Sequence, residues 1–579
     1  MIGQATRKWI GGAIAIAAMG AFAFGLFHLS PWAASWDEVD FVLALDRYDL
    51  LAMQPHAPGY PYFILGGRLM RLWTGIDGPA ALSLWNLLLT ASSVFPLYRL
   101  ARRWLQPFAA TVAAALVLTL PMNAALGVRA MSEGAALALM WWYLWAAVRA
   151  AERPTTARFL GAAFAFSLLM GTRLSYAPLG LALGWIWLGA TTVGGANRQT
   201  AARLARGFVW LVCAALCQLL WLAGMAAAEG GAGSMLVLLK SFALGHFEQW
   251  GGGAIADPMS PASRLLLFFG DNVLWTGAFA RSEALLAAAA LLLGSAIIAA
   301  GTAGREARAG AGVGTGTAQE VALDATAVRT APNEGSVSKL ETGANLLRSF
   351  PNGDSTQDSR GSTGRSLQPA SYDGLAHKLR TAAQQLRRPT PGVLLVAASA
   401  AYALWALLGQ NIAKPRHAAP IAALLLFGLA VQALRKRPFS PPAAAKAALA
   451  SALLLLAAQT TEAARLVALQ DSQRPAVYRL ADYAKARMPA DAVLYTWEEE
   501  RVLYYLRRDI QTRPIYTYAY FLADLQAAPD RRIWLTGAVL EGFRRQGAPT
   551  DHARLLARFS SDGRLDPVYG NISLYEWVR

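Results

Sequence analysis

Long apolar runs separated by short polar segments cover most of the chain. Most runs approach the roughly 20 residues that a helix needs to cross the hydrocarbon core of a bilayer. The pattern predicts a polytopic α-helical membrane protein with about 11 transmembrane helices. A further run at 263–280 is interrupted by Asp271 and Asn272, which predicts an interfacial or re-entrant helix. The predicted spans are 9–29, 80–100, 107–125, 131–150, 157–171, 174–192, 207–228, 283–301, 391–409, 418–434 and 443–468.

Two segments depart from this pattern. Residues 302–390 are rich in Gly, Ser, Thr and Ala, and such a composition buries too little apolar surface to offset its ordering entropy. We expect a disordered cytoplasmic linker there, between a transmembrane module at 1–301 and further transmembrane helices at 391–470. Residues 471–579 predict a small extracytoplasmic α/β domain with a largely parallel sheet, which caps the membrane part without contributing catalytic residues. Its predicted strands are 493–496, 532–535 and 572–578, and its predicted helices are 478–487, 499–508 and 539–546.

The net charge of +17 would suit a nucleic-acid-binding protein, but the distribution of the charge argues against that class. Arg and Lys gather at the ends of predicted helices, as at 7–8, 102–103 and 435–437. This is the positive-inside pattern of membrane proteins, and it predicts a cytoplasmic N-terminus. The first loop (30–79), the loop at 414–417 and the C-terminal domain then share the outer face. We therefore expect a membrane protein with no nucleic-acid partner.

The first outer loop carries three carboxylates in four positions, Asp37, Glu38 and Asp40. On a helix, Asp37 and Asp40 share a face and Glu38 points away from it. Two crowded carboxylates raise the pKa of one of them, which suits a base that takes a proton from a hydroxyl or an amine. The same oxygens would suit a divalent cation. An acidic first turn that stabilises a helix dipole explains the cluster equally well, so the spacing leaves the catalytic residue and any metal undecided.

The turn that follows contains His56 and Tyr60 among three prolines, Pro55, Pro58 and Pro61. Proline fixes the backbone angle φ, so the two side chains are held as oriented groups that could grip a phosphate or a sugar hydroxyl. The alternative is a turn at the membrane interface with Tyr60 in the aromatic belt.

Further ionisable residues lie at the predicted outer ends of the spans. Glu133 opens the fourth span, where a carboxylate is costly unless it is paired or functional, and Arg129, four residues earlier, is its expected partner. Arg173, between the fifth and sixth spans, is placed to contact the anionic headgroup of a lipid substrate or of the bilayer.

A cationic cluster, Lys414, Arg416 and His417, joins the ninth and tenth spans. Its charge opposes the positive-inside bias, so an anionic ligand explains it better than topology does. Arg presents paired donors that match a phosphate group.

Taken together, these residues resemble the GT-C superfamily of integral-membrane glycosyltransferases, which includes protein O-mannosyltransferase-like and aminoarabinose-transferase-like families. The resemblance covers roughly residues 1–300 and 390–470, while the soluble tail is similar only in position and class. It rests on Asp37–Asp40, the Pro-His-x-Pro-Gly-Tyr-Pro turn, Ser132–Glu133, Arg173 and Lys414–His417.

The resemblance implies a polyprenyl-phosphate-linked monosaccharide as donor and an inverting transfer to a lipid, glycan or protein acceptor. The reaction would take place on the extracytoplasmic face of a bacterial inner membrane. A first-loop aspartate, Asp37 or Asp40, would act as the base. Lys414, Arg416 and Arg173 would stabilise the charge of the leaving phosphate.

Two other functions compete with this interpretation. A transporter or flippase for lipid-linked or anionic solutes would favour charged residues in mid-span and internal repeats, and the sequence shows neither. A non-catalytic cell-envelope protein that keeps the GT-C shell is the second alternative, and the sequence leaves it open.

Overall fold

The computed structural model of the chain describes residues 4–192, 199–257, 259–298, 300–301, 389–436, 442–506, 509–515 and 517–578. The described residues belong to one compact unit. The predicted cytoplasmic linker at 302–390 lies outside the described residues except for its last two positions.

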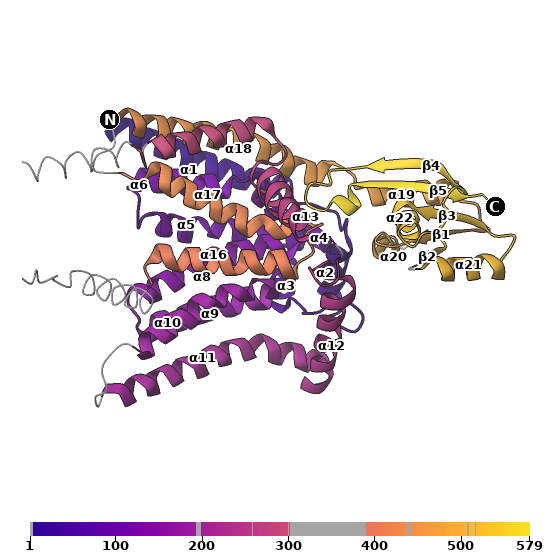
Figure 1. The fold of residues 1–579 in the computed structure, drawn as a ribbon, viewed down its shortest axis with the longest axis horizontal. Helices are drawn as coiled ribbons and strands as arrows, with labels where there is room; N and C mark the ends of the chain where they lie inside the picture. Colours follow the sequence, from indigo (N-terminus) through magenta and orange to yellow (C-terminus); the bar gives the residue numbers. More distant parts are fainter. Residues whose placement is uncertain are drawn as a thin grey trace, which may run out of the picture. The chain divides into compact units, whose positions relative to one another are not determined.

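All eleven predicted apolar spans are helical, and several of the long helices run side by side (Figure 1). By length and composition, five described helices can cross a membrane, or up to seven if each of two bent pairs is one span. A membrane protein with several spans is therefore confirmed, and the number 11 stays a prediction. The helices are α1 (Gln4–Phe27), α4 (Gly78–Ser92), α5 (Val94–Ala101), α6 (Pro107–Leu118), α7 (Pro121–Gly127), α8 (Ser132–Glu152), α9 (Thr156–Thr172), η1 (Leu174–Gly180), α10 (Leu181–Thr192), α11 (Gln199–Ala228), Glu283–Ile298, α16 (Pro391–Gly409), α17 (Ala419–Leu434) and α18 (Pro442–Ser472).

The run at 263–280 is helical through its polar pair and ends at residue 278. After α12 (Ala232–Gly245) and the short η2 (His246–Trp250), it forms α13 (Pro261–Leu265) and the π-helical η3 (Leu266–Ala278). The chain then bends by 100° into Glu283–Ile298, which makes this pair a broken span or a re-entrant loop. The Asn272 side-chain amide donates to the carbonyl of Ile412 at 2.6 Å. This polar residue therefore binds the backbone just before the basic loop at 414–417.

The first outer loop forms two helices, α2 (Trp36–Asp46) and α3 (Pro61–Thr74). Helix α2 begins at Ser35, whose hydroxyl accepts from the Glu38 amide, as expected of a polar N-cap. Helix α3 packs closely against α4 at Gly66, where an added methyl group would come within 2.2 Å of the Trp85 ring.

The C-terminal segment forms a five-stranded sheet in the order β2-β1-β3-β5-β4. Strand β1 pairs in parallel with β2 and β3, whereas β5 is antiparallel to both β3 and β4. The expected α/β domain is present, but the expectation of a largely parallel sheet is wrong for half of it. The reason is the hairpin of β4 and β5, since a short connection permits only antiparallel pairing. The elements are α19 (Ala476–Arg487), β1 (Ala492–Thr496), α20 (Glu500–Leu506), β2 (Thr512–Pro514), α21 (Tyr518–Ala527), β3 (Arg532–Thr536), α22 (Gly537–Arg545), β4 (Ala553–Ser560), η5 (Pro567–Tyr569) and β5 (Asn571–Trp577).

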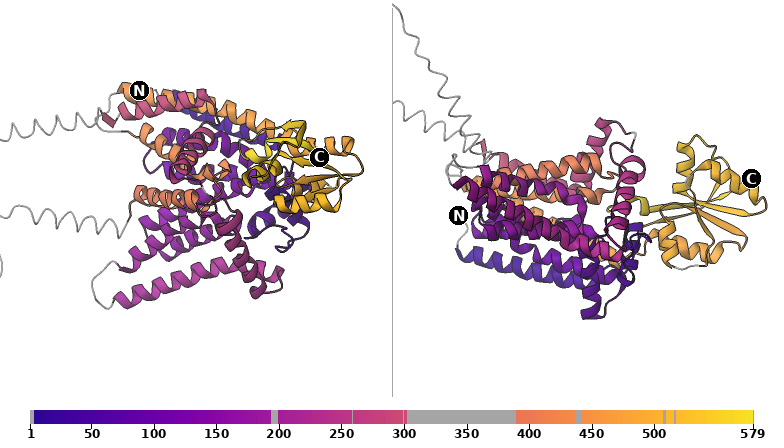
Figure 2. Two further views of the ribbon diagram at one scale, coloured as in Figure 1. Left: turned by 45° about the vertical axis from the view of Figure 1, so that its right-hand side comes forward. Right: turned by 90° about the horizontal axis from the view of Figure 1, so that it is seen from below.

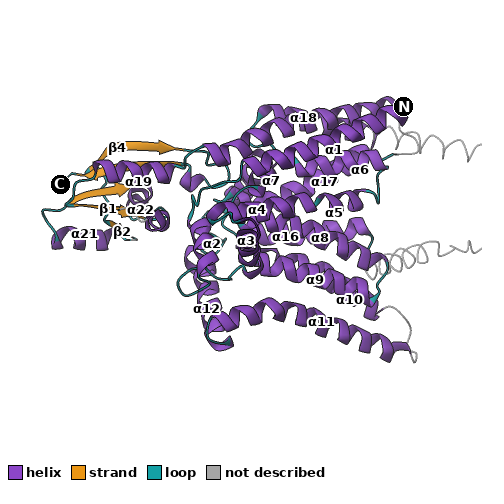
Figure 3. Cartoon of the chain, turned by 180° about the vertical axis from the view of Figure 1, so that it is seen from behind, coloured by secondary structure: helices purple, strands orange, loops and turns teal. Residues whose placement is uncertain are grey.

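Helices lie on both faces of the sheet (Figures 2 and 3). Leu494 and Trp534 face a cluster that contains α19 and α20, and this cluster continues into the first outer loop through α2 and α3. Val493 and Leu535 face α21 and α22 in a separate cluster. Because strand side chains alternate in direction, the same two strands anchor the domain to the first loop and close its own core.

The close contact of α3 with α4 predicts a stability difference between two glycines. Gly66→Ala should destabilise the folded protein by ~1–3 kcal/mol, because the added methyl group overpacks the contact with Trp85. Gly161→Ala on α9 is the matched control, since nothing lies within 4 Å of its added Cβ. Thermal unfolding in detergent measures both variants. Equal melting temperatures for the two would contradict the packing described here.

Candidate functional site

The guanidinium of Arg416 is the centre of the candidate site and is bound by three carboxylates. Its Nε donates to Glu133 Oε1 at 2.7 Å and its Nη2 donates to Asp37 Oδ2 at 2.6 Å. Its Nη1 donates to Asp566 of the C-terminal domain. These three partners come from α8, α2 and the segment between β4 and β5, so one buried side chain joins three distant parts of the chain.

Asp37 keeps part of its surface accessible, and cations surround it. Its side chain is 22% exposed, whereas the side chains of Glu38 and Asp40 are 0% exposed. Burial by itself would raise the pKa of Asp37, but Lys414 and Arg416 outweigh it and hold that pKa well below its usual range. Asp37 is therefore ionised at neutral pH and is the most accessible of the three first-loop carboxylates.

The ammonium of Lys414 acts on this carboxylate electrostatically and forms no hydrogen bond or ion pair within 4.0 Å to any described residue. Burial tends to lower the pKa of the Lys414 ammonium, yet the negative charge of Asp37 raises it overall. The ammonium is therefore charged at neutral pH. Unlike this ammonium, the guanidinium of Arg416 has its donors taken by carboxylates.

Glu133 is bound from two sides, but not by the expected partner. Besides Arg416, Arg173 approaches Glu133 Oε1 at 3.1 Å and donates to the Ser132 hydroxyl at 2.8 Å. The predicted pair of Arg129 with Glu133 is wrong, because α8 begins only at Ser132 and the two residues do not share a helical face. Within the described part of the chain, Glu133 Oε2 and Asp566 Oδ1 are buried atoms with no hydrogen-bond partner.

Arg129 instead forms a buried two-point ion pair with Glu38. Its Nε and Nη2 donate to the two carboxylate oxygens at 2.6 and 3.1 Å. Glu38 Oε2 also accepts from the Ala34 amide and the Ser35 hydroxyl at the start of α2. With both oxygens engaged, Glu38 holds α2 against the loop before α8 and has no free acceptor for a substrate.

Asp40 takes part in a second chain of hydrogen bonds, which does not include Arg416. Its Oδ1 accepts from Arg501 Nε at 2.6 Å, and its Oδ2 lies 2.9 Å from His56 Nδ1. His56 Nε2 lies 3.1 Å from the Tyr60 hydroxyl. Complete burial raises the pKa of Asp40, in opposition to His56 and Arg501. Burial also raises the pKa of Tyr60.

The proline-rich turn orients Tyr60 through an uncommon backbone conformation. Tyr60 has φ of 48°, in the left-handed region that side chains seldom adopt, and it is the N-cap of α3. Gly59 before it has φ of 99°, and a Cβ there would come within 2.5 Å of the Tyr48 hydroxyl. That hydroxyl donates to the Gly59 carbonyl at 2.9 Å. The turn is thus held by the rest of the loop as well as by its prolines.

The basic loop separates its three predicted residues into different environments. Arg416 is buried among carboxylates, and Lys414 remains partly exposed. His417 Nδ1 lies 3.0 Å from the Asn411 carbonyl, and its Nε2 lies 4.0 Å from Glu133 Oε1. The three residues therefore do not present one joint cationic surface, although all of them lie near Glu133 or Asp37.

Side chains of the C-terminal domain contact both the first loop and the basic loop at 414–417. Asp566 binds Arg416, and Arg501 binds Asp40. The Tyr569 hydroxyl accepts from the Trp36 amide at 3.0 Å, next to Asp37. The sequence did not single these residues out. Asp566 and Tyr569, in an Asp-Pro-x-Tyr turn, resemble ordinary loop residues, and Arg501 follows three glutamates that suggest a solvated face.

The sequence left a divalent cation undecided, and among the described residues no group of three His, Cys, Asp or Glu side chains is arranged to hold a metal. Asp37, Glu133 and Asp566 do converge, but on the guanidinium of Arg416. The arginine lies where a bridging cation would have to bind.

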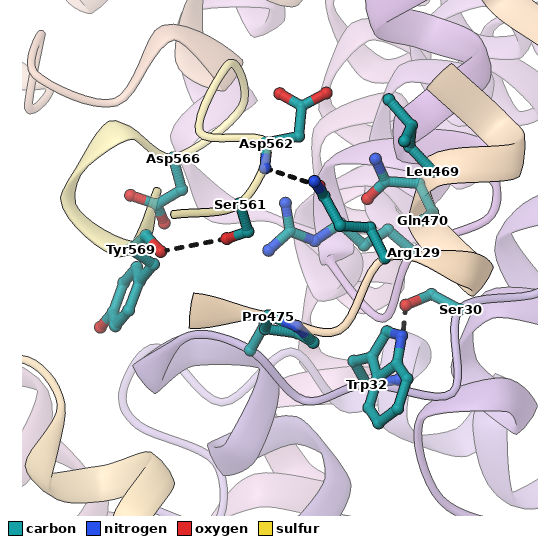
Figure 4. Close-up of a pocket in the computed structure, with 12 residues that line it drawn as sticks. Ser30, Trp32, Arg129, Leu469, Gln470, Pro475, Ser561, Asp562, Asp566 and Tyr569 are labelled. Atoms are coloured by element: carbon teal, nitrogen blue, oxygen red, sulfur yellow. Dashed lines mark hydrogen bonds between the residues drawn. The ribbon is translucent and has the colours of Figure 1, made fainter. Parts of the chain in front are cut away.

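A pocket opens beside this cluster, at the junction of the first loop with the C-terminal domain. Figure 4 shows Arg129, Asp566, Trp32 and Gln470 among the residues that line it. The lining is mostly polar. The pocket therefore reaches the Arg416 cluster from the side of Asp566 rather than from that of Asp37.

Comparison with known families bears on the identity of the transmembrane part. Residues 55–221 match the model of the family described as dolichyl-phosphate-mannose-protein mannosyltransferase. This match confirms the resemblance to the GT-C membrane glycosyltransferases. It includes the His56–Tyr60 turn, Glu133 and Arg173, and it covers less than a third of the chain. No curated protein matches the chain in sequence.

Three of the solved structures to which the chain is similar are the following. ArnT from Cupriavidus metallidurans, bound to undecaprenyl phosphate, is 11% identical over 98% of both chains, with a TM-score of 0.46. The oligosaccharyltransferase AglB from Archaeoglobus fulgidus, in complex with an inhibitory peptide and a dolichol-phosphate, is 13% identical over 99% of this chain and 74% of AglB, with a TM-score of 0.44. Arabinofuranosyltransferase AftD from Mycobacteria is 17% identical over 99% of this chain and 40% of AftD, with a TM-score of 0.43.

The Glu38–Arg129 pair predicts a stability effect without a direct role in catalysis. Glu38→Gln should destabilise the protein by ~3–5 kcal/mol, because it leaves a buried arginine without its counter-charge. The double variant Glu38→Met, Arg129→Met should recover most of this loss, since no unpaired charge remains. Chemical denaturation of the detergent-solubilised chain measures both variants. If the double variant is as unstable as the single one, the pair is not the cause.

The lowered pKa of Asp37 predicts how its contribution to stability depends on pH. A carboxylate whose folded-state pKa lies below its ordinary value of 3.8 stabilises the fold above that value, and the stabilisation is lost as the pH falls through the folded-state pKa. The difference in melting temperature between wild type and Asp37→Asn should therefore stay constant from pH 8 to about pH 5 and shrink only below about pH 4. A difference that shrinks between pH 7 and pH 5 would contradict the lowered pKa.

Proposed function

We propose that the chain is a membrane glycosyltransferase that moves a monosaccharide from a polyprenyl-phosphate donor to an acceptor, with inversion at the anomeric carbon. The observation that carries this proposal is the partly exposed, ionised carboxylate of Asp37 beside the unpaired ammonium of Lys414. Within one site, the carboxylate can activate a nucleophile and the ammonium can stabilise the leaving phosphate.

Asp37 is the better candidate of the two first-loop aspartates for direct contact with the acceptor. Both oxygens of Asp40 are taken by His56 and Arg501, and its side chain is fully buried. Asp37 has one hydrogen-bond partner among the described residues, Arg416. Its carboxylate can accept a hydrogen bond from the acceptor hydroxyl or amine and thereby activate it as the nucleophile attacks the anomeric carbon.

Lys414 is the candidate group for the donor phosphate. As the bond between the sugar and the phosphate oxygen breaks, that oxygen gains negative charge, and a preorganised cation at this point lowers the barrier. Arg416 and Arg173 contribute positive potential while they hold Glu133. Unpartnered Glu133 Oε2 is a buried acceptor suited to a hydroxyl of the donor sugar.

A lipid-linked donor also accounts for the combination of a polar site with many apolar helices. The prenyl chain would lie in the bilayer and the phosphate at the membrane surface. With the N-terminus in the cytoplasm of a bacterial inner membrane, the site would face outward. The C-terminal domain would then be extracytoplasmic, and the acceptor would be a lipid, glycan or protein on that side.

The proposal predicts transfer from a defined donor by the purified full-length chain in liposomes. A panel of radiolabelled undecaprenyl-phosphate monosaccharides serves as donor, and the envelope fraction of a strain that lacks the chain serves as acceptor. Asp37→Asn should lower the rate by at least ~10²-fold, the range for loss of a general base. Lys414→Gln should lower it comparably by loss of charge stabilisation. The matched controls are Asp46→Asn, at the exposed end of α2, and Lys485→Gln, half exposed on α19.

The outcome separates the alternatives. Transfer by the wild-type chain that Asp37→Asn and Lys414→Gln abolish, with both controls active, supports the proposal. Wild-type chain that releases no sugar from any donor of the panel rejects it. Full activity of Asp37→Asn rejects the role of Asp37 and leaves the reaction itself standing.

A further inference from the structure

The hydrogen-bond chain from Arg501 to Tyr60 is not used by the mechanism above. We propose that Tyr60, His56 and Asp40 form a proton relay that receives the proton of the acceptor nucleophile, and that Arg501 of the C-terminal domain holds this relay in place. The inference rests on the proposed transferase function and names further residues for that same site.

The partners of Asp40 determine the protonation pattern of the chain. Both of its oxygens accept hydrogen bonds, from Arg501 Nε at 2.6 Å and from His56 Nδ1 at 2.9 Å. A carboxylate with an arginine partner accepts rather than donates, so the imidazole proton is assigned to Nδ1. The lone pair on Nε2 then accepts the hydroxyl proton of Tyr60 at 3.1 Å. This is the arrangement of a base that is oriented by a buried carboxylate.

Tyr60 connects the chain to the candidate site. Its hydroxyl donates its only proton to His56, so its oxygen keeps lone pairs to accept a proton from a further group. Its side chain lies within electrostatic range of Arg173, Asp37 and Glu133, the last two of which bind Arg416. His56 acts on Asp37 as well. The two ends of the relay are therefore the candidate site on one side and the C-terminal domain on the other.

The surroundings of His56 favour proton transfer along the chain over exchange with water. Its side chain is 13% exposed. The Phe41 ring lies 5.6 Å from the imidazole and the Phe242 ring of α12 stacks on it at 6.1 Å. The charged or titratable groups that face it are Asp40, Tyr60, Asp37 at longer range and, through Asp40, Arg501.

The relay supplies what Asp37 lacks. Held at a low pKa by Lys414 and Arg416, Asp37 orients the nucleophile well but is a weak final base, because the efficiency of a base rises with its pKa. Histidine is the side chain most often used to take up such a proton near neutral pH. Asp37 and the relay would then divide the task between orientation and proton uptake.

The step is balanced as follows. The acceptor oxygen or nitrogen forms a bond to the anomeric carbon while the bond from that carbon to the phosphate oxygen breaks, and its electron pair leaves with the phosphate. The proton of the nucleophile passes to the Tyr60 oxygen as the Tyr60 proton passes to His56 Nε2. The imidazolium is stabilised by ionised Asp40, and it returns its proton to the departing phosphate or to solvent.

Arg501 is a positioning residue, since it acts through Asp40. Its Nη2 also donates to the carbonyls of Ala52 and Met53 at 3.2 and 2.9 Å. It thus ties the turn that carries His56 and the helix that carries Asp40 to α20 of the C-terminal domain. This explains why a side chain of the sheet domain enters the first outer loop.

Steady-state transfer by the full-length chain in liposomes, between pH 5 and pH 9, tests the relay with the donor panel described above. Tyr60→Phe and His56→Gln should lower kcat by ~10²-fold or more with KM within ~3-fold, as for loss of an acid–base group. The pH profile of kcat should differ between wild type and His56→Gln, because the variant lacks the relay. Arg501→Gln should lower kcat less and should also change this profile.

Matched controls separate the relay from general damage to the fold. Tyr62→Phe removes the next tyrosine hydroxyl along the chain, and His28→Asn breaks a second His–Asp pair, His28–Asp471, away from the site. Both should transfer at wild-type rates. In ¹⁵N-histidine spectra of the solubilised chain, one signal of an imidazole protonated at Nδ1 should disappear in His56→Gln and change in Asp40→Asn.

Two results overturn the relay, and each differs from failure of the proposed function. If Tyr60→Phe and His56→Gln keep the wild-type rate and pH profile while Asp37→Asn is inactive, the transferase stands and the relay is rejected. If the His56 signal reports protonation at Nε2, the assigned direction of proton flow is wrong. Only a wild-type chain that transfers no sugar rejects the function and the relay together.

Discussion

The buried charge of Arg416 is the constraint on which the rest of the candidate site depends. A guanidinium without access to water is tolerated only where its charge is compensated and its donors are satisfied, and removal of one partner of such a pair typically costs ~3–5 kcal/mol. Its three carboxylate partners lie on α2, on α8 and between β4 and β5. The first loop, the helical part and the C-terminal domain must therefore all be in place before any of the three is fully stable.

This arrangement gives Asp37, Glu38 and Asp40 different roles. Both carboxylate oxygens of Glu38 accept from Arg129, and this pair holds α2 in position. The two oxygens of Asp40 are bound by His56 and Arg501, and Asp40 thereby orients the proline-rich turn. Asp37 alone of the three remains partly exposed, next to an ammonium with no ion-pair partner among the described residues. Three neighbouring carboxylates thus take different roles because they differ in burial and in the residues that bind them.

Much of the fold follows from local sequence patterns, whereas the pairing of the site residues does not. Apolar run length predicted the helices, and the charges at their ends placed His56, Glu133, Arg173 and Lys414 near one another. The partners were missed because they are distant in sequence: Arg416 and Asp566 are 150 residues apart, and Asp40 and Arg501 are 461 apart. Local spacing misled in one case, since Arg129 and Glu133 are four apart but α8 starts between them. The antiparallel half of the sheet was missed because the β4 pattern alternates only weakly.

The central claim is that Asp37 activates an acceptor toward a sugar on a polyprenyl phosphate. Mass spectrometry of lipid extracts from cells that lack the chain tests it most directly, because an unused donor accumulates whatever the acceptor is. The account predicts one polyprenyl-phosphate-linked monosaccharide that rises in the deletion strain, stays high when Asp37→Asn is expressed and returns to the normal level with wild type or Asp46→Asn. Unchanged levels of every lipid-linked sugar in the deletion strain, or full restoration by Asp37→Asn, would contradict the account.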